Sequence, residues 1–334
     1  MLYSRRSALK LGLAMGALTS VTTRRSTVVA QGRTPPGTRV IQTPVLEIAF
    51  EESGDTQGFP IFLLHGFPDD VRAWDGVAAP LAGRGYRVIV PYLRGYGPTR
   101  FRESSAPRMA QQAAIGQDLL DLADGLGVSR FAVAGYDWGN RAACIAAALH
   151  PERVRAGVFI GGYTIQDTLA PPQPAAPERE RALWYQWYFN TERGRVGLER
   201  DRRGICRLLW KEWSPTWRFT DATFERTAAS FDNPDFVAVV IHSYRHRNGN
   251  ASGEPRFTDM ERRLAQRPKI ETPSVVLYGA DDGLGGSAAD TPAERASFTT
   301  RVARQVVSGA GHFLPREKPD AVSSALLLLL DGTR

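Results

Sequence analysis

The segment from Phe131 to Arg141 has the clearest chemical meaning in this sequence. It reads Phe-Ala-Val-Ala-Gly-Tyr-Asp-Trp-Gly-Asn-Arg, an apolar run followed by a turn that Gly135 and Gly139 enclose. A strand that passes directly into a helix through Gly-x-nucleophile-x-Gly needs small neighbours, because the two backbones come close, and it presents its central residue at an exposed tip. That central residue is Asp137. The pattern therefore predicts a nucleophile elbow whose nucleophile is a carboxylate.

An aspartate at this position suits a different reaction from a serine. A carboxylate is already an anion at pH 7, so it can attack a saturated carbon and form an alkyl ester without help from a base. Water must then hydrolyse the ester, and this second step needs a histidine base. Epoxides and carbon–halogen bonds are substrates of this kind. The structural alternative is that Asp137 only caps the following helix, because aspartate is favoured at helix N-termini.

The elements around the elbow predict an α/β architecture. Strands are expected at 45–51, 60–64, 86–92, 154–160, 274–278 and 302–307, besides the elbow strand that begins at Phe131. Helices are expected at 72–83, at 109–127, from the elbow to about His150, and at 319–330. Strands that alternate with helices predict a mostly parallel sheet flanked by helices.

Between Tyr163 and Phe257 the pattern changes, and strand-like runs give way to aromatic and charged residues. The aromatic residues include Trp184, Tyr185, Trp187, Tyr188, Phe189, Trp210, Trp213 and Trp217. We expect 163–257 to form an inserted helical cap over the strand ends, where it would roof a pocket. The predicted organisation is a leader at 1–30, a linker at 31–44, the core at 45–162 and 258–334, and the cap between the two core parts.

Four features together resemble the epoxide-hydrolase branch of the α/β-hydrolase superfamily. They are the elbow, the inserted cap, the loop His65-Gly66-Phe67-Pro68 and the segment Arg94-Gly95-Tyr96-Gly97. The resemblance extends from about Val45 to Leu330 and implies an α/β-hydrolase fold. It also implies a cis peptide bond before Pro68. The backbone N–H groups of Phe67 and Trp138 would form the oxyanion hole.

The same resemblance supplies the remaining members of the triad. The histidine in Gly309-Ala310-Gly311-His312 matches the base, and Asp282 matches the acid, with Asp281 left open because the two carboxylates are adjacent. The other histidines fall elsewhere: His65 in the oxyanion loop, His150 at the end of the elbow helix, and His242 and His246 in the cap.

Ring opening of an epoxide also needs a proton donor for the departing oxygen, and phenols can serve. The resemblance implies two cap tyrosines, Tyr185 in Tyr-Gln-Trp-Tyr-Phe and Tyr244 in Tyr-Arg. The alternative is that both rings only pack. Substrate contacts are expected from Phe67, Trp138, Trp184 and Tyr188.

Arg141 leaves a second activity open. Haloacetate dehalogenases hold a carboxylate with an arginine four residues after the nucleophile, but they also have arginine directly after it, where this chain has Trp138. Haloalkane dehalogenases share Asp-Trp but place Asn or Glu at the position of Phe67. Epoxide hydrolysis is therefore the leading prediction, with Arg141 as a structural residue of the elbow helix. Dehalogenation is second, and a hydrolase-fold binding protein without turnover is third.

Composition restricts the possible partners. The formal net charge is +7, but Arg5, Arg6, Lys10, Arg24 and Arg25 lie in the first thirty residues without any acidic residue, and removing these five charges leaves +2. No polybasic tract with stacking aromatics is present, so nucleic acid is not an expected partner. We expect a small-molecule substrate and no cofactor or metal, since no Cys/His cluster has ligand spacing. The two cysteines, Cys144 and Cys206, are expected to be buried free thiols.

The leader predicts export. Ser4 to Lys10 contains a twin-arginine pair, 11–21 is modestly apolar, and Val28-Val29-Ala30 offers small residues for cleavage before Gln31. The expected location is periplasmic or secreted, with membrane contact only during export. An ordinary secretory signal is the alternative. Replacing Arg5 and Arg6 with lysine should leave precursor in the cytoplasm, as cell fractionation would detect, and normal export of that variant would contradict the twin-arginine assignment.

Overall fold

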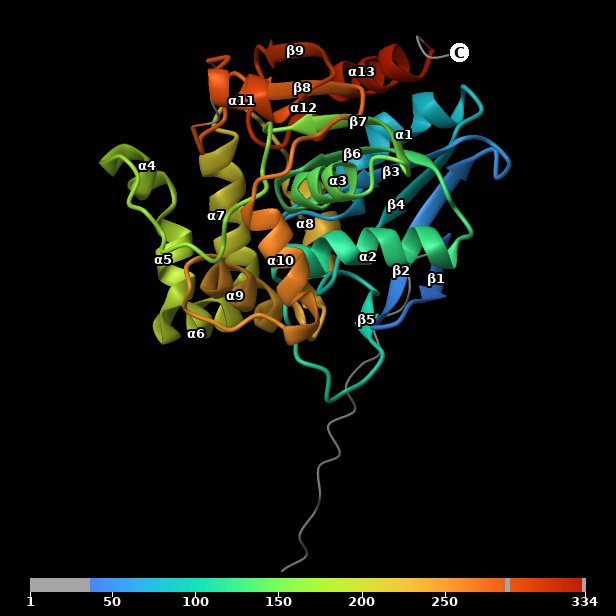
Figure 1. Ribbon diagram of the computed structural model, residues 1–334. Coiled ribbons are helices and arrows are strands. Elements are labelled where there is room, and N and C mark those ends of the chain that lie inside the picture. Colours follow the sequence, from blue (N-terminus) through green and yellow to red (C-terminus); the bar gives the residue numbers. More distant parts are fainter. Residues whose placement is uncertain (1–36, 286–288, 332–334) are drawn as a thin grey trace, which may run out of the picture. The chain divides into compact units, whose positions relative to one another are not determined.

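The computed structural model describes residues 37–285 and 289–331 of the 334-residue chain (Figure 1). The predicted leader at 1–30 and the first part of the predicted linker lie outside the described residues.

The strands of the described chain form one sheet. They are β1 (Thr38–Gln42), β2 (Leu46–Gly54), β3 (Pro60–Leu64), β4 (Arg87–Pro91), β5 (Arg100–Phe101), β6 (Phe131–Tyr136), β7 (Val154–Ile160), β8 (Ser274–Gly279) and β9 (Arg301–Val307). Their order is β1-β2-β4-β3-β6-β7-β8-β9, and β5 pairs with β2. The neighbouring strands β4, β3, β6, β7, β8 and β9 run parallel to one another. Strands β1, β4 and β5 pair with β2 in antiparallel fashion. The predicted mostly parallel sheet is therefore confirmed.

The central strands are buried along nearly their whole length. Every residue of β6 is buried, and in β3, β7 and β8 all but one are buried. Burial on both faces explains why these segments are largely apolar and do not alternate, with Arg155 of β7 as a charged exception. In the register between β3 and β6, Leu64 lies opposite Gly135, which brings the ends of both strands to the elbow.

Helices flank the sheet and fill the connections. The core helices are η1 (Val71–Trp74), α1 (Asp75–Ala82), α2 (Gln112–Gly125), α3 (Asp137–Leu149), α10 (Thr258–Ala265), α11 (Pro292–Ser297), α12 (Leu314–Glu317) and α13 (Pro319–Asp331). Helix α2 packs on α3, and both lie on the near side of the sheet in Figure 1, whereas α1 packs on α13. In the described ranges, no helix combines the length and apolar composition needed to cross a membrane.

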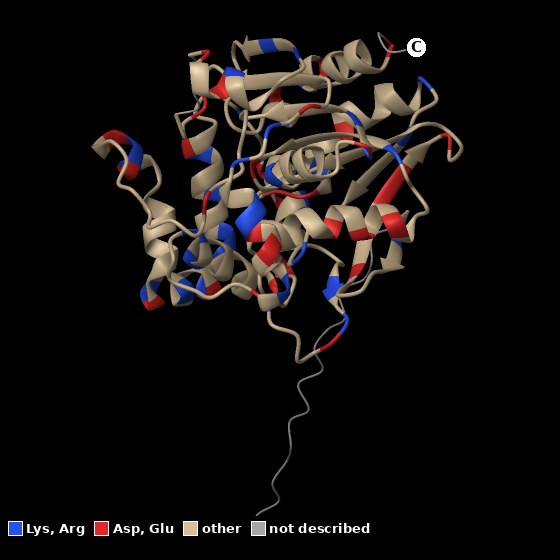
Figure 2. Cartoon of the chain, in the orientation of Figure 1, with Lys and Arg blue, Asp and Glu red and all other residues tan. Residues whose placement is uncertain are grey.

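The segment between β7 and α10 is helical, without a strand among its residues. It contains α4 (Pro177–Ala182), α5 (Trp184–Asn190), α6 (Glu192–Arg200), α7 (Arg202–Trp213), α8 (Asp221–Ala228), η2 (Ala229–Asp232), α9 (Phe236–Arg247) and η3 (Pro255–Phe257). Acidic and basic residues are interspersed over both this cap and the core (Figure 2).

One predicted boundary is wrong. The segment 31–44 was expected to be a linker, but Thr38–Gln42 is β1, which pairs with β2 over five residues. Val40 is half exposed, at 51%, so the strand lies at the sheet edge and buries little apolar surface. The sequence before this strand is rich in proline and glycine, which is typical of a linker. The strand itself is too short to show a clear alternation of apolar and polar residues, and it contributes mainly backbone hydrogen bonds.

Candidate active site

The elbow has the strained geometry that its sequence predicts. Strand β6 ends at Tyr136, helix α3 begins at Asp137, and Asp137 has a φ of 51°, which is unusual for a residue with a side chain. A Cβ on Gly139 would lie 2.1 Å from the backbone oxygen of Leu64, so only glycine fits at that position. The helix N-cap is Tyr136, and it makes no side-chain capping bond. Asp137 therefore does not serve as the helix cap.

The carboxylate of Asp137 is held between two loops. Its Oδ1 accepts a hydrogen bond of 2.8 Å from the backbone N–H of Phe67, and its Oδ2 lies 3.7 Å from Nε2 of His312. The peptide bond between Phe67 and Pro68 is cis, as expected. The N–H of Trp138 belongs to the first turn of α3, where amide groups have no partner within the helix. Of the two predicted oxyanion donors, the Phe67 N–H therefore contacts the Asp137 carboxylate, and the Trp138 N–H lies in the same helix turn as Asp137.

His312 connects Asp137 to a second carboxylate. Its Nδ1 lies 3.1 Å from Oδ2 of Asp282, and its backbone N–H donates to the carbonyl of Trp213 at 3.1 Å. Asp282 also accepts the N–H of Leu284 at 2.8 Å. Asp281 instead accepts from the Thr216 hydroxyl at 3.1 Å. Asp282 is therefore the carboxylate that contacts the imidazole.

Burial and charge act against each other at this histidine. Burial lowers the pKa of His312, but the charges of Asp282 and Asp137 outweigh it and raise this pKa to about 10. Burial opposes the charged form of Asp137 as well, yet the contacts with His312 and with the Phe67 N–H hold its pKa below the ordinary value. At neutral pH the site thus holds an anionic carboxylate beside an imidazolium.

Two phenols face this carboxylate from the cap. The rings of Tyr185 on α5 and Tyr244 on α9 are 5.3 Å apart and perpendicular, and the ring of Phe67 lies 6.4 Å from the first and 5.5 Å from the second. The Tyr185 hydroxyl accepts from the Gln186 amide at 3.0 Å, whereas the buried Tyr244 hydroxyl has no partner within the described residues. Burial and then the charge of Asp137 raise the pKa of Tyr185 to about 12, and burial raises that of Tyr244 well above its ordinary value. Both phenols therefore remain protonated donors.

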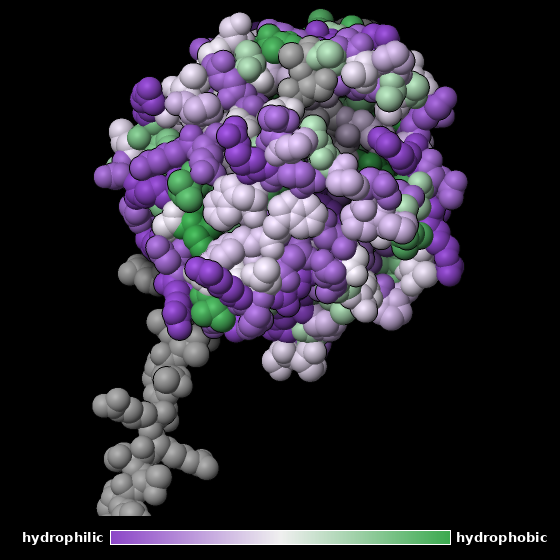
Figure 3. Space-filling model, turned by 90° about the vertical axis from the view of Figure 1, so that its left-hand side faces the viewer, coloured by the Kyte–Doolittle hydropathy of each residue, from purple (hydrophilic) through white to green (hydrophobic). Residues whose placement is uncertain are grey.

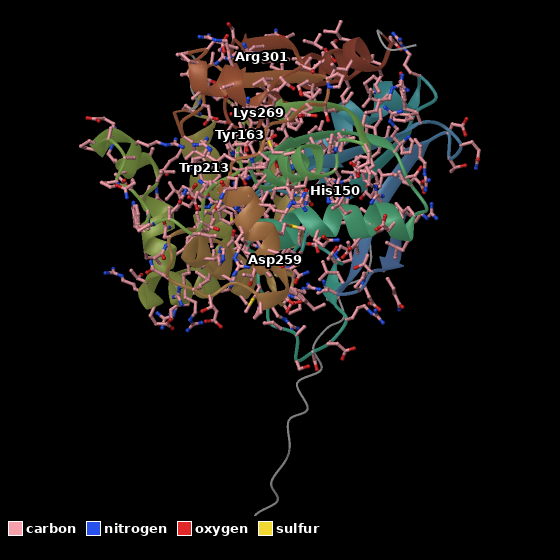
Figure 4. The ribbon with its side chains drawn as sticks, in the orientation of Figure 1. His150, Tyr163, Trp213, Asp259, Lys269 and Arg301 are labelled. Atoms are coloured by element: carbon pink, nitrogen blue, oxygen red, sulfur yellow. The ribbon has the colours of Figure 1, made fainter. Side chains whose placement is uncertain are left out.

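A cavity of about 640 Å³ opens onto the carboxylate, His312 and Tyr185, whereas the fully buried Tyr244 does not line it. Asp137, Asp282 and His312 line it from the core, and Tyr185 and Gln186 line it from the cap. Figure 3 shows the cap face of the molecule, where mostly hydrophilic residues surround a pale area of intermediate hydropathy. In Figure 4, Tyr163 and Trp213 mark the region between the sheet and the cap helices.

None of the four predicted substrate contacts lines this cavity. Phe67 and Trp138 are buried beneath it, with stacked rings 5.7 Å apart. Trp184 and Tyr188 do not line it. The Trp184 indole donates to Glu212 at 2.8 Å, and the Tyr188 hydroxyl lies over Gly197 of α6. One helix turn separates these two residues on α5, and both contact other parts of the cap instead of the cavity. Their prediction as substrate contacts is therefore not supported.

Arg141 differs from its predicted role in an epoxide hydrolase. It was expected to be a structural residue of the elbow helix, but its side chain lines the cavity beside Asp137. Its Nη1 donates to the side chain of Gln166 at 2.8 Å, and its buried Nε has no partner in the described part of the chain. The i, i+4 spacing from Asp137 was the available signal, since it places both side chains on one face of α3.

Sequence reasoning missed a buried ion pair behind the elbow. Arg316 forms a double contact with Asp69, and Tyr136, the residue before the nucleophile, donates to the same carboxylate at 2.5 Å. The neighbouring Asp70 accepts from Thr227 at 3.0 Å and so reaches the cap. The acidic pair directly after Pro68 was the only local signal, because its partners lie more than sixty residues away along the chain.

His65 and the two cysteines are buried within the protein and take no part in the site chemistry. His65 accepts from the Leu93 N–H at 3.1 Å through Nε2, and complete burial lowers its pKa to about 4, so it remains neutral. Cys144 and Cys206 are buried free thiols, as predicted. Burial raises the pKa of Cys144 to about 11, which keeps it protonated.

Comparisons with known proteins agree with this geometry. Residues 60–319 match the family described as the alpha/beta hydrolase fold. Epoxide hydrolase A of Mycobacterium tuberculosis is 27% identical over 324 residues, which cover 89% of this chain and 98% of that protein. Epoxide hydrolase 2 of Siraitia grosvenorii is 36% identical over 297 residues, which cover 80% of this chain and 90% of that protein. A solved structure from Klebsiella pneumoniae, described provisionally as an epoxide hydrolase, has a TM-score of 0.84 at 40% identity and covers 90% of this chain and 98% of its own.

The chain therefore belongs to the α/β-hydrolase family. Within that family it falls in the epoxide-hydrolase-like branch, as the sequence predicts.

Proposed function

We propose that this protein hydrolyses epoxides to vicinal diols through an ester formed on Asp137. The observation that carries the proposal is the position of this carboxylate. It lies beside the His312–Asp282 pair and accepts the N–H of Phe67, against whose ring the two cap phenols pack. The epoxide hydrolases among the relatives support it. A carboxylate nucleophile, a histidine base and phenolic acids are together the groups that epoxide hydrolysis requires.

In the first step, an oxygen of Asp137 attacks a ring carbon and the bond from that carbon to the ring oxygen breaks. The electron pair passes to the ring oxygen, which takes a proton from Tyr185 or Tyr244. The low pKa of Asp137 keeps the nucleophile ionised, and the raised pKa values of the tyrosines keep the donors protonated. The product of this step is a hydroxyalkyl ester.

In the second step, water attacks the carbonyl carbon of the ester and gives its proton to Nε2 of His312. Ester formation removes the charge of Asp137, which is one cause of the raised pKa of His312. This pKa therefore falls after the first step. The imidazolium then loses its proton, which replaces the one that the tyrosine gave to the ring oxygen, and the neutral imidazole becomes available as a base. The N–H groups of Phe67 and Trp138 stabilise the oxyanion. When the intermediate collapses, the bond to the alkyl oxygen breaks and that oxygen takes the proton from His312, which releases the diol. The second proton of the water then passes to His312, which restores the carboxylate beside the imidazolium.

Oxygen-18 water tests the route of the oxygen. In a single turnover, the diol should contain no label, because its new hydroxyl comes from Asp137, and the label should appear in the carboxylate of that residue. Diol from later turnovers should carry one labelled oxygen. Mass spectrometry of the diol and of the peptide that contains Asp137 measures both. Label in the first diol would indicate direct attack by water and contradict the ester.

The same assay separates the rival functions. A dehalogenase would release halide from a halogenated substrate and leave the epoxide intact. A binding protein without turnover would return both compounds unchanged. Either result with an otherwise folded protein would overturn the proposed epoxide hydrolysis.

A further inference from the structure

The wall of the active-site cavity contains as many arginines as carboxylates, but the two sets differ in their hydrogen-bond and ion-pair partners. The arginines are Arg141, Arg179, Arg247 and Arg267, and the carboxylates are Asp137, Asp167, Glu180 and Asp282. Arg141 is buried and Arg247 half-buried, whereas Arg179 and Arg267 are exposed. The cavity thus has two inner and two outer guanidinium groups.

The carboxylates already have partners that are not these arginines. Asp137 and Asp282 flank His312. Asp167 accepts two backbone N–H groups at 3.0 Å, and Glu180 accepts a backbone N–H at 2.6 Å and the Trp187 indole at 2.8 Å. None of these carboxylates forms a direct ion pair with an arginine of the cavity, although the charge of Asp137 acts on Arg141 and Arg247 from a distance.

The arginines, in turn, have no anionic partner among residues 37–285 and 289–331. Arg247 lies over the ring of Tyr244, 4.9 Å from its centroid, and Arg267 lies over that of Tyr163 at 5.6 Å. Arg141 uses Nη1 for Gln166, while its buried Nε is unpartnered. A buried guanidinium that no anion contacts directly is costly, so this arrangement favours an anion that binds there.

Arg141 is the arginine best placed to orient a substrate. It is only 8% exposed and follows the nucleophile by one turn of α3, so both side chains share a helix face. Because Gln166 occupies Nη1, the edge formed by Nε and Nη2 is left, and its two N–H groups match the two oxygens of a carboxylate. Burial and the like charge of Arg247 lower the pKa of Arg141 to about 9, so it remains a cation at pH 7.

We propose that the physiological substrate is an epoxide that carries a carboxylate, and that Arg141 and Arg247 bind this carboxylate while Asp137 attacks the ring. This substrate class rests on the epoxide hydrolysis proposed above. The two guanidinium groups offset the repulsion between an anionic substrate and the Asp137 carboxylate. The exposed Arg179 and Arg267 attract the anion toward the cavity. Because Arg141 and Asp137 are one helix turn apart, only a short chain can separate the carboxylate of the substrate from its epoxide ring.

Two pairs of compounds separate binding of the charge from chemistry at the ring. The first pair is 3,4-epoxybutanoate and 3,4-epoxybutanamide, which have nearly the same shape and differ by one charge. The second is cyclopropylacetate and cyclopropylacetamide, in which a methylene replaces the ring oxygen, so that they bind without reacting. Turnover of the first pair gives kcat/KM, and calorimetry of the second pair gives Kd.

We expect kcat/KM to be about 10²-fold higher for the acid than for the amide, with cyclopropylacetate binding tighter than its amide by a similar factor. Arg141→Gln should remove most of both preferences, and Arg141→Lys should restore part of them because it returns the charge. Arg247→Gln, at a half-buried position, should reduce both preferences even if the Arg141 variants fold poorly. Arg262→Gln removes the same charge from an exposed ion pair with Asp259 outside the cavity, and it should change neither preference.

The outcomes distinguish the two proposals. Equal turnover of acid and amide, with equal binding of their analogues, would overturn the carboxylate site and leave epoxide hydrolysis intact. No turnover of either epoxide, with binding of cyclopropylacetate that depends on Arg141, would support the carboxylate site and overturn epoxide hydrolysis. An acid preference that survives both Arg141→Gln and Arg247→Gln would overturn the assignment to these two arginines.

Discussion

His312→Gln should stop the reaction halfway and leave the substrate attached to Asp137. Attack by the carboxylate needs no base, whereas hydrolysis of the ester needs the imidazole that lies 3.7 Å from Oδ2 of Asp137. Intact-protein mass spectrometry should show an increase equal to the mass of the epoxide, and peptide mapping should locate it on Asp137. Overall turnover should fall on the order of 10⁴-fold or more, as for removal of other triad members.

Asp137→Ala should also abolish turnover, but without any adduct, because it removes the atom that forms the bond. The two variants therefore have similarly low turnover, but only the His312 variant accumulates the covalent adduct. His150→Gln is the matched control, since this histidine ends α3 at the protein surface and contacts Glu152, and it should keep full activity. If the His312 variant binds epoxide but never becomes alkylated, the order of the two steps is wrong.

Local patterns were sufficient for the elements that position the site. The strand 60–64 and the strand 154–160 were predicted with the bounds that β3 and β7 have, because short, largely apolar runs with turn residues at both ends are typical of buried strands. The elbow was equally predictable, since the spacing of Gly135 and Gly139 around Asp137 follows from close backbone contact. In each case the physical cause lies within a few residues of the chain.

Features that depend on distant contacts were not predictable in this way. The adjacent Asp281 and Asp282 have the same chemistry, and only the positions of Thr216 and His312 distinguish them. The pair between Asp69 and Arg316 joins residues 247 positions apart, and the acidic residues after Pro68 do not indicate which partner they have. The direction of a side chain on a short amphipathic helix, as for Trp184, likewise depends on what the neighbouring helices cover.

The same limit explains the unexpected position of Arg141. From sequence alone, an arginine on a helix that packs against a sheet is predicted to be structural, because its aliphatic part can cover apolar surface while its guanidinium group reaches solvent. Here the head instead lies in the cavity wall, and Gln166 from the segment after β7 holds it there. The cavity exists only after the cap has been placed over the elbow.

Replacing both Tyr185 and Tyr244 with phenylalanine should abolish nearly all ring opening. Each hydroxyl can protonate the departing ring oxygen, so each single Tyr→Phe change should slow epoxide turnover by about 10²-fold, or less where the other hydroxyl compensates. The double variant loses both donors and should fall by about 10⁴-fold. Pre-steady-state measurement of ester formation would detect the effect in the step where the proton is transferred.

Stability should change little, so the loss can be assigned to chemistry. The Tyr244 hydroxyl has no partner among the described residues, and removing an unsatisfied buried hydroxyl costs little or stabilises the fold. The Tyr185 hydroxyl accepts one hydrogen bond from Gln186, which contributes roughly 0.5–1.5 kcal/mol. Tyr86→Phe is the control, because that hydroxyl contacts Asp331 far from the cavity, and it should leave ring opening unchanged.

The tyrosines also decide between the two leaving groups, because a departing halide needs no proton. Activity on a haloacetate should therefore survive in the double variant if the protein is a dehalogenase, and Arg141→Leu should then destroy it by removing the partner of the carboxylate. In an epoxide hydrolase the pattern is different: the neutral epoxide depends on Tyr185 and Tyr244, and Arg141 matters only when the substrate carries a charge. Measuring a neutral epoxide and a haloacetate with both sets of variants separates these cases. Haloacetate turnover that ignores both tyrosines and disappears with Arg141, together with an inert epoxide, would reverse the assignment, since the leaving atom would then be a halogen.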